Sequence, residues 1–440
     1  MIKRKIEHKL EEWKESQAHK PVVIKGCRQC GKTFSVRRFA EENYKNVLYL
    51  NFFENPDFND VFSGSLTVDA IMMRLSALAG GDFSAEPNNT CLIFDEIQEC
   101  PDARTSLKFF ALDGRYDVLC TGSLLGVKGY GNKEVRSIPV GYETIIEMFP
   151  LDFEEFLWAN GINDTVINYL HECLDNETPV QTAIHNRMRE LFRQYIIVGG
   201  MPAVVSEFAT THNLGQVLTM QRTIVDEYRD DMVKYASASD KPHIRECFDS
   251  IPTQLAKENK KFQYSVIRKK GTSALYSGCL QWIEDAGIVR RCYNLSIPEL
   301  PLAGNALNDS FKVYMADSGL FVSMLEDGAQ YDILNGNAGG YNGAIYENII
   351  ADVFGKMGRR LYYFRKDSGL EIDFIMRYRG ESTLVEVKAT NGNAKSAKTV
   401  LAHPEKYRVG GLIKFGDYNV GRNGRTLTLP LYMSFMLTQV

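Results

Sequence analysis

The segment Gly26–Thr33 constrains this chain more than any other, because it fits the phosphate-binding pattern G-x-x-x-x-G-K-[ST]. The apolar run Pro21–Ile24 before it is typical of a short buried strand, and Phe34–Ala40 after it is typical of a helix. A glycine-rich turn between a strand and a helix lets backbone N–H groups surround phosphates, and the helix N-terminus adds partial positive charge. The sequence therefore predicts a site for a nucleoside triphosphate, with ATP and Mg²⁺ as its ligands.

Nine consecutive residues form the predicted nucleotide-binding loop. We expect the Lys32 ammonium to reach the β- and γ-phosphates and to act in catalysis, and the Thr33 hydroxyl to bind Mg²⁺. The whole set is Gly26, Cys27, Arg28, Gln29, Cys30, Gly31, Lys32, Thr33 and Phe34. Cys27 and Cys30 also form a C-x-x-C pair, but no second pair exists to complete a zinc site. Redox control of the loop stays an alternative to a purely structural role for these thiols.

A second apolar run, Thr90–Phe94, ends in two acidic residues. A continuous run of this length is typical of a strand that is buried on both faces of a parallel sheet. We expect Asp95 to hold Mg²⁺ through water, and Glu96 to polarise the attacking water as a general base. A third strand, Tyr116–Cys120, is followed by the hydroxyls of Thr121 and Ser123, one of which would sense the γ-phosphate or position the water. We favour Thr121 for this catalytic role.

These segments resemble the AAA-type ATPases of the additional-strand class, in which an acid pair and a polar sensor follow the phosphate loop in this order. Lys25–Thr33, Phe94–Gln98 and Phe149–Leu157 further resemble one prokaryotic family, which joins an AAA-like domain to a C-terminal half of unknown function. Gly199–Pro202 and Tyr228–Asp231 match the middle region of that family. The resemblance spans nearly the whole chain and implies ATP binding and hydrolysis.

One position departs from the pattern of that family. After Pro139–Gly141 the family usually has arginine, whereas this chain has Tyr142. If that arginine acts as a trans-acting finger in relatives, its role here falls to another residue, such as Arg136, or is lost.

Length and composition indicate a globular protein with several domains. The chain has 440 residues, which predicts two or three domains, and its 44% hydrophobic and 24% charged residues are ordinary globular values. A net charge of −4 gives no overall attraction to nucleic acid or to an anionic membrane, so such binding would need local patches. Met1–Lys5 leads into a charged helix rather than a secretory signal, and no apolar run reaches ~18 residues. We therefore expect a cytoplasmic protein without membrane contact; the oligomeric state is not indicated.

The middle of the chain divides into two predicted parts. Residues 151–240 read as a helical connector, because segments such as Ala183–Phe192 have the spacing of amphipathic helices. Residues 241–333 read as a winged helix, with helices at Ile244–Leu255, Tyr264–Arg268 and Ser273–Asp285 and then two strands. Between Ala256 and Arg291 three acidic residues stand against eight basic ones, which are Lys257, Lys260, Lys261, Arg268, Lys269, Lys270, Arg290 and Arg291. This charge predicts contact with DNA phosphates; contact with a protein partner is the alternative.

The C-terminal residues 334–440 form a predicted α/β domain with a second catalytic-looking constellation. A helix over Ala344–Met357 precedes a strand at Arg360–Arg365 and then a hairpin. Four residues in these elements resemble the site of the restriction-endonuclease-like PD-(D/E)XK fold. They are Glu347, Asp373, Glu386 and Lys388.

The chemistry of that fold explains the residue types. Glu386 and Lys388 share one face of a strand, because residues two apart point the same way, and the hairpin brings Asp373 beside them. We expect Asp373, Glu386 and Glu347 to bind Mg²⁺, and Lys388 to stabilise charge in catalysis. The alternative is a degenerate domain whose charged residues form an ion-pair network and which binds DNA or a partner without cutting.

The predicted fold class is therefore α/β with four parts. These are an AAA-like P-loop NTPase domain with a parallel sheet (1–150), a helical connector (151–240), a winged helix (241–333) and a restriction-endonuclease-like domain (334–440). The leading functional hypothesis is an ATP-hydrolysing, DNA-associated enzyme with a metal-dependent nuclease domain. The rival is a nucleotide-operated switch or scaffold that binds a protein partner and has no nuclease activity.

Overall fold

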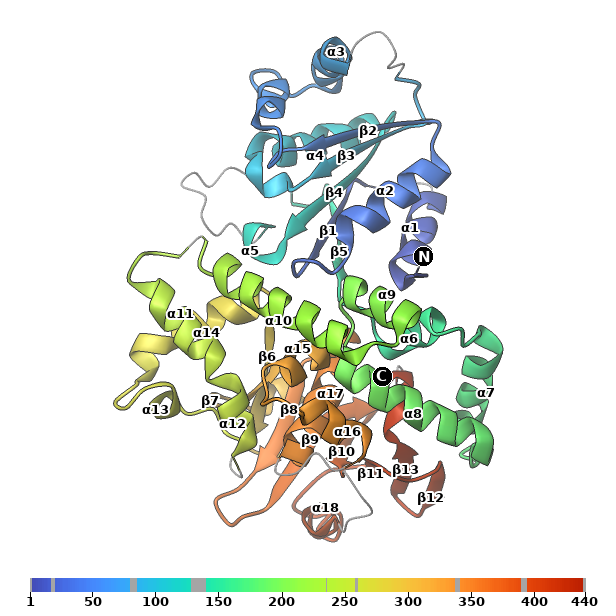
Figure 1. Ribbon diagram of the computed structural model, residues 1–440, viewed down its shortest axis with the longest axis vertical. Helices are drawn as coiled ribbons and strands as arrows, with labels where there is room; N and C mark the ends of the chain where they lie inside the picture. The colour runs from blue at the N-terminus through green and yellow to red at the C-terminus, as the bar shows by residue number, and fades with distance from the viewer. Residues whose placement is uncertain are drawn as a thin grey trace. The chain divides into compact units, whose positions relative to one another are not determined.

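The chain forms two compact units, seen here in a computed structural model (Figure 1). One unit holds Lys3–Pro150 together with Asp285–Gly287, and the other holds Leu151–Glu284 and Ile288–Val440. The structure describes residues 2–16, 20–79, 85–127, 140–234, 236–257, 260–336, 341–388 and 394–437.

The first unit is built on a five-stranded parallel sheet with the strand order β2-β3-β4-β1-β5. The strands are β1 (Val22–Gly26), β2 (Asn46–Asn51), β3 (Thr90–Asp95), β4 (Asp117–Ser123) and β5 (Thr144–Met148). Every residue of β3 is buried, as expected for a strand covered on both faces. The sheet confirms the predicted parallel α/β architecture of this part.

Helices cover both faces of this sheet (Figure 1). Val22 and Ile24 of β1 pack with α1 and α2, whereas Val23 between them packs with α3 and α4, because successive strand residues point to opposite faces. The helices are α1 (Lys5–Glu15), α2 (Lys32–Asn43), α3 (Val68–Ala79), α4 (Pro101–Asp113) and α5 (Leu124–Val127), with 3₁₀ helices η1 (Pro56–Phe62) and η2 (Ile97–Glu99).

The second unit begins with a helical region that agrees with the predicted connector. Its helices are α6 (Phe153–Ala159), α7 (Asp164–Asp175), α8 (Thr182–Val198), α9 (Pro202–Thr211) and α10 (Leu214–Asp231). The first of them starts at a capping box: the Glu155 N–H donates to the Asp152 carboxylate (2.9 Å), and the Asp152 N–H donates to the Glu155 carboxylate (3.1 Å). This reciprocal pair satisfies two N–H groups that a helix start leaves without partners.

Four short helices follow: α11 (Asp240–Asp249), α12 (Ile251–Ala256), α13 (Tyr264–Ile267) and α14 (Ser273–Asp285). The single helix predicted over Ile244–Leu255 is wrong, since two helices meet at Ser250 there. Pro252 lies in the first turn of α12, where its missing N–H costs no hydrogen bond.

The rest of the unit is a mixed eight-stranded sheet with the order β12-β13-β11-β10-β9-β8-β6-β7. Its strands are β6 (Val289–Leu295), β7 (Ala306–Met315), β8 (Leu361–Arg365), β9 (Glu371–Tyr378), β10 (Glu381–Val387), β11 (Gly411–Gly416), β12 (Gly421–Asn423) and β13 (Thr426–Pro430). The β6–β7 hairpin, which we assigned to the winged helix, pairs through β6 with β8 of the predicted C-terminal domain. One sheet thus crosses the boundary expected at residues 333 and 334, and the four-part division stays a prediction.

The C-terminal helices are α15 (Ser318–Ser323), α16 (Ala329–Leu334), α17 (Asn342–Lys356) and α18 (Lys395–Leu401), with 3₁₀ helices η3 (Leu302–Asn305) and η5 (Leu431–Met436). Among them, α15, α17 and α18 contact strands of this sheet, whereas α16 contacts α8 (Figure 1). The order α17-β8-β9-β10-α18-β11 runs helix, three antiparallel strands, helix and a strand parallel to β10. It places Glu347 on a helix and Asp373 and Glu386 on adjacent strands.

Among the helices that the structure describes, none combines the length with the apolar character that crossing a bilayer requires.

Candidate functional site

The phosphate-loop motif connects the carboxyl end of β1 to the first turn of α2. Gly31 has a φ of 94°, a left-handed conformation that glycine adopts without strain. Gly26 has a different constraint, because a Cβ atom built on it would lie 2.3 Å from the Met148 carbonyl oxygen. Phe34, the last residue of the predicted set, is exposed in the first turn of α2. Both glycines of the pattern are therefore required by the local backbone.

Lys32 is buried at the start of α2. Its ammonium donates hydrogen bonds to the carbonyl oxygens of Gly26 (3.1 Å) and Cys27 (2.8 Å). These bonds hold the positive charge within the curve of the loop, where the sequence predicts phosphate.

Asp95 is the centre of the polar contacts at the carboxyl end of β3, and it is buried. Its Oδ1 accepts a hydrogen bond from the Thr33 hydroxyl (3.0 Å) and another from the Thr121 hydroxyl. The Tyr49 hydroxyl donates to Oδ2 (2.6 Å). The structure thus brings together three residues that the sequence predicted, and the hydroxyl and carboxylate oxygens of Thr33 and Asp95 are ligands that suit Mg²⁺.

Thr121 lies deeper than its predicted role suggests. Its side chain is fully buried, and its hydroxyl bonds to the Asp95 carboxylate. This contact orients the carboxylate; the predicted contact of Thr121 with the γ-phosphate stays a prediction.

Two residues of this cluster, Tyr49 and Asn51, are absent from the sequence-based set. The Asn51 amide donates to the Tyr49 hydroxyl (3.1 Å), and Asn51 lies opposite Asp95 in the register of β2 with β3. Burial and the bond to Asp95 raise the pKa of Tyr49, so its hydroxyl remains a donor at neutral pH. The strand Asn46–Asn51 ends in polar residues, which was a signal for a site in the sequence. Only the pairing of this strand with β3 shows that these residues lie beside Asp95.

Glu96 follows Asp95 in a left-handed conformation, with φ 53° and ψ 48°. Such a backbone is uncommon for a residue other than glycine. It turns the chain from β3 into η2, and the Gln98 amide donates to the Glu96 carboxylate. Gln98 therefore positions Glu96, the predicted general base. The sequence pattern around Glu96 did not predict this hydrogen bond.

The C-x-x-C pair lies buried inside the loop, with both cysteines as free thiols. A hydrogen bond from Cys27, with the positive charges of Lys32 and Arg4, outweighs burial and lowers the pKa of the Cys30 thiol to about 6. The Arg4 guanidinium also donates to the Cys30 carbonyl oxygen (3.0 Å). The Cys30 thiol also donates to the Met148 carbonyl oxygen (3.6 Å).

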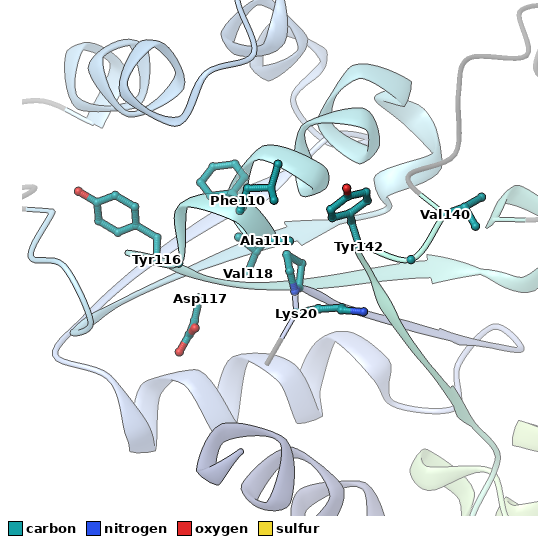
Figure 2. Close-up of a pocket in the computed structure, with 12 residues that line it drawn as sticks. Lys20, Phe110, Ala111, Tyr116, Asp117, Val118, Val140 and Tyr142 are labelled. Atoms are coloured by element: carbon teal, nitrogen blue, oxygen red, sulfur yellow. The ribbon is translucent and has the colours of Figure 1, made fainter. Parts of the chain in front are cut away.

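A separate cavity of about 630 Å³ lies in the same unit, beside the amino ends of β1 and β4 (Figure 2). Figure 2 shows Lys20, Tyr116 and Tyr142 around it. The phosphate loop follows the carboxyl end of β1, so this cavity is not the predicted nucleotide site. The Lys108 ammonium lies 5.3 Å from the centroid of the Tyr142 ring, and Arg136 lies outside the described residues.

In the second unit, Glu347 of α17 lies buried among positive charges. Its carboxylate contacts the ammonium groups of Lys260 (2.5 Å) and Lys312 (3.4 Å), and it accepts a hydrogen bond from the Tyr314 hydroxyl (2.9 Å). Burial opposes ionisation, but the two ammonium groups prevail and lower the pKa of Glu347 to about 2. Glu347 is therefore a charged, fully paired carboxylate.

The other predicted metal ligands lie on the β9–β10 hairpin. Asp373 accepts a hydrogen bond from the Val387 N–H (2.8 Å), and the Lys388 ammonium contacts Glu386 (2.6 Å) and Asp373 (3.7 Å). Burial and the negative charges of Glu347 and Glu386 raise the pKa of Asp373 to about 7. The four predicted residues thus form one electrostatic cluster.

This cluster does not fit the metal shell that the sequence predicted. Within the described residues, no three histidine, cysteine or acidic side chains are arranged to hold a metal ion. Glu347 and Glu386 each contact a lysine instead, and Lys312 also pairs with Glu371 (2.8 Å). Lys260 and Lys312 were missed because the sequence assigned them to the winged helix.

The predicted DNA-contact surface is smaller than the sequence indicated. Lys260 is paired with Glu347, and Arg291 with Glu284 (2.8 Å). The basic residues that remain exposed are Lys257, Lys261, Arg268, Lys269 and Lys270.

Three family models match successive parts of the chain. An AAA domain matches residues 18–157. Two domains of unknown function follow, DUF8612 over residues 189–331 and DUF4143 over residues 342–433. The match confirms the predicted order of an AAA domain and C-terminal regions of unknown function, while the nuclease-like identity stays a proposal.

Several solved structures are similar over much of their length. A Walker-type ATPase of Pyrococcus abyssi is 12% identical and covers 74% of this chain and 96% of its own, with a TM-score of 0.44. The ORC2 protein of Aeropyrum pernix is 14% identical over 75% and 90%, with a TM-score of 0.34. The RuvB Holliday junction branch migration motor of Thermotoga maritima is 13% identical over 66% and 90%, with a TM-score of 0.30. No curated protein matches the chain.

Proposed function

We propose that this chain, which carries an AAA domain over residues 18–157 and C-terminal regions of unknown function, binds and hydrolyses ATP. The observation that carries the proposal is the 3.0 Å hydrogen bond between the Thr33 hydroxyl and the Asp95 carboxylate. It joins the phosphate loop to the acidic end of β3, with the Lys32 ammonium in the same loop. This contact between the two predicted halves of the site supports the proposal.

Each residue has a part in the proposed reaction. Lys32 binds the phosphates, and Thr33 and Asp95 hold Mg²⁺, which supplies charge neutralisation on the phosphates when bound. Glu96 accepts a proton from the water that attacks the γ-phosphorus, while the bond from this phosphorus to the β–γ bridging oxygen breaks and ADP leaves. Gln98 orients the Glu96 carboxylate. Thr121 and Tyr49 fix the Asp95 carboxylate by donating to its two oxygens.

Nucleotide binding by purified full-length protein tests this proposal. Lys32→Ala is expected to abolish tight binding of MgATP, because it removes the only lysine of the predicted loop. Lys45→Ala is the matched control, since Lys45 lies exposed on the same unit and pairs with Glu86. Equal affinity of the Lys32→Ala and Lys45→Ala variants would contradict the assignment.

We further propose that the ATPase associates with DNA. The support is the exposed basic set around α12 to α14, in a chain whose net charge is −4. Hydrolysis is expected to rise when duplex DNA is added to the wild-type protein. A rate that DNA leaves unchanged, in a protein that does not bind DNA, would favour a protein as the effector.

A second candidate function has its own support in the C-terminal cluster. In this second function the chain would act as a nucleotide-operated switch or scaffold, and its nuclease-like domain would not cleave DNA. Lysines neutralise Glu347 and Glu386, and the nearby carboxyl of Asp373 has a pKa raised to about 7. In this arrangement lysine ammonium groups contact the carboxylates that a nuclease site would offer to a metal ion.

Thermal melting in Mn²⁺ separates the two functions of the C-terminal domain. The test uses the full chain, since β6 and β7 share the sheet of β8 to β13. A nuclease site is expected to stabilise the fold by roughly 2.7 kcal/mol at a metal concentration 100 times the dissociation constant. Asp373→Ala would then remove both the stabilisation and any cleavage. An unshifted midpoint without nicking of DNA supports the switch.

A further inference from the structure

A small cavity of about 130 Å³ lies in the second unit, away from the charge cluster around Glu347. Helix α8, helix α17, the end of β11 and η5 line it. Its polar lining residues are Arg189, Arg193, Tyr346, Asp417 and Tyr432. Two guanidinium groups thus share one small space with a single carboxylate.

The two arginines differ in their partners. Arg189 forms an ion pair with Asp417. Arg193, one helical turn later, has no hydrogen bond or ion pair with any residue that the structure describes. The lining residues therefore carry one uncompensated positive charge.

Two phenol groups complete the lining. The Tyr432 hydroxyl is hydrogen-bonded to His185 Nδ1 (2.9 Å) on α8. The Tyr346 hydroxyl has no hydrogen-bond partner among the described residues, and it lines the same cavity as Arg193. A hydroxyl and a guanidinium that line the same cavity both offer hydrogen-bond donors to a ligand there.

We propose that this cavity binds the phosphate group of a free phosphate ion or of a larger molecule. A guanidinium presents several N–H donors in one plane, a geometry that matches phosphate oxygens. The cavity volume of about 130 Å³ leaves room for one phosphate group. Arg193 and Tyr346 are its principal donors, and the bound anion balances the excess charge.

Calorimetric titration with inorganic phosphate tests the proposal. The Lys32→Ala background removes binding at the phosphate loop, so the signal reports other sites. Arg193→Gln is expected to weaken phosphate binding at least ~10-fold, because a charged hydrogen bond is lost. Arg187→Gln is the matched control on the same helix, since Arg187 is exposed and pairs with Glu190.

Tyr346→Phe keeps the test decisive if Arg193→Gln does not fold, because it removes one hydroxyl and preserves the packing. It is expected to weaken phosphate binding several-fold. Absence of saturable binding in the Lys32→Ala background would overturn the proposal, and so would an affinity that neither variant changes.

Oligonucleotides with and without a 5′-phosphate show whether the bound phosphate group is a free ion or part of a larger molecule. Displacement of inorganic phosphate by the phosphorylated form alone supports a terminal phosphate of a larger molecule. Displacement by neither form, with phosphate still bound through Arg193, supports the free ion.

Discussion

At the scale of single residues, Asp95 shows what a motif can reveal and what it cannot. The spacing of the phosphate loop and the acid-ended strand was sufficient to predict Lys32, Thr33 and Asp95. The Tyr49 hydroxyl, which donates to Asp95 at 2.6 Å, could not be predicted in this way. Its position depends on the pairing of β2 with β3, a contact between segments about forty residues apart.

Lys260 is the residue whose role changed most. Charge counting placed it on a DNA-contact surface, yet its ammonium contacts Glu347 at 2.5 Å and only 14% of its side chain is exposed. A local excess of lysine and arginine does not show which of them face buried acids from distant segments. Lys260 therefore belongs to the charge cluster around Glu347 and not to the predicted DNA-contact surface.

A glycine of the phosphate loop gives a prediction at this scale. Gly26→Ala is expected to destabilise the first unit by roughly 1–3 kcal/mol, because the new methyl group meets the Met148 carbonyl oxygen at 2.3 Å. Gly278→Ala is the contrasting variant, since it lies exposed in α14 with no atom within 4 Å of the added Cβ. It is expected to stabilise by ~0.5–1 kcal/mol. Thermal melting compares them, and a neutral Gly26→Ala variant would refute the steric argument.

At the scale of elements, the pattern of apolar residues predicted where the strands lie in the sequence better than it predicted which strands pair. The apolar runs gave β1, β3 and β4 within a few residues, because a strand buried on both faces has no polar alternation. The β6–β7 hairpin was also expected, but its edge pairing with β8 was not. Tertiary contacts decide which sheet edge a hairpin joins. The sequence pattern of a hairpin is the same whether it forms the wing of a winged helix or extends a larger sheet.

Helix α17 carries a titrating group whose effect on stability has a definite sign. Asp352 is fully buried; its Oδ2 accepts from the Lys356 ammonium (2.9 Å), and its Oδ1 has no partner among the described atoms. Burial, against the attraction of Lys356, raises the pKa of this carboxyl from 3.8 to about 7. Between these two values the native state holds a proton that the unfolded chain has lost, so stability falls as pH rises.

Asp352→Asn is expected to remove this dependence. The contribution of Asp352 declines by roughly 1.4 kcal/mol for each pH unit in that window, so the advantage of wild type over the variant shrinks as pH rises. Urea unfolding of both proteins at about pH 5 and about pH 7 measures it. Glu227→Gln, a change at an exposed acid on α10, is the control. A wild-type advantage that is constant with pH would show that Asp352 is ionised throughout.

At the scale of the whole molecule, the sequence predicted the order of its parts more securely than their chemistry. An AAA domain precedes regions of unknown function. The C-terminal acids Asp373 and Glu386 do lie together, since the Lys388 ammonium contacts both. Whether such acids bind metal depends on the lysines around them. These lysines come from segments that are distant in the sequence, such as Lys312 of β7, which contacts Glu347 of α17. That information is absent from the spacing of the acids along the chain.

DNA association gives a prediction for the full chain. Binding to duplex DNA is expected to weaken steeply with salt, and each phosphate contact removed lowers the salt slope by about 0.9. Joint neutralisation of the exposed Lys261, Lys269 and Lys270 tests this, whereas Lys260→Gln is expected to reduce stability instead of the slope. Salt-dependent binding curves provide the measurement. An unchanged affinity and slope in the triple variant would assign this region to a protein partner.

The central claim is that the first unit hydrolyses ATP with Glu96 as the base. The most direct measurement compares Glu96→Gln with wild type for both MgATP affinity and the rate of phosphate release. Loss of a positioned base is expected to reduce turnover by ~10²–10⁴-fold, while the loop that contains Lys32 still binds nucleotide. Retained binding with lost turnover is the predicted result. Equal turnover by the variant and wild type would contradict the account.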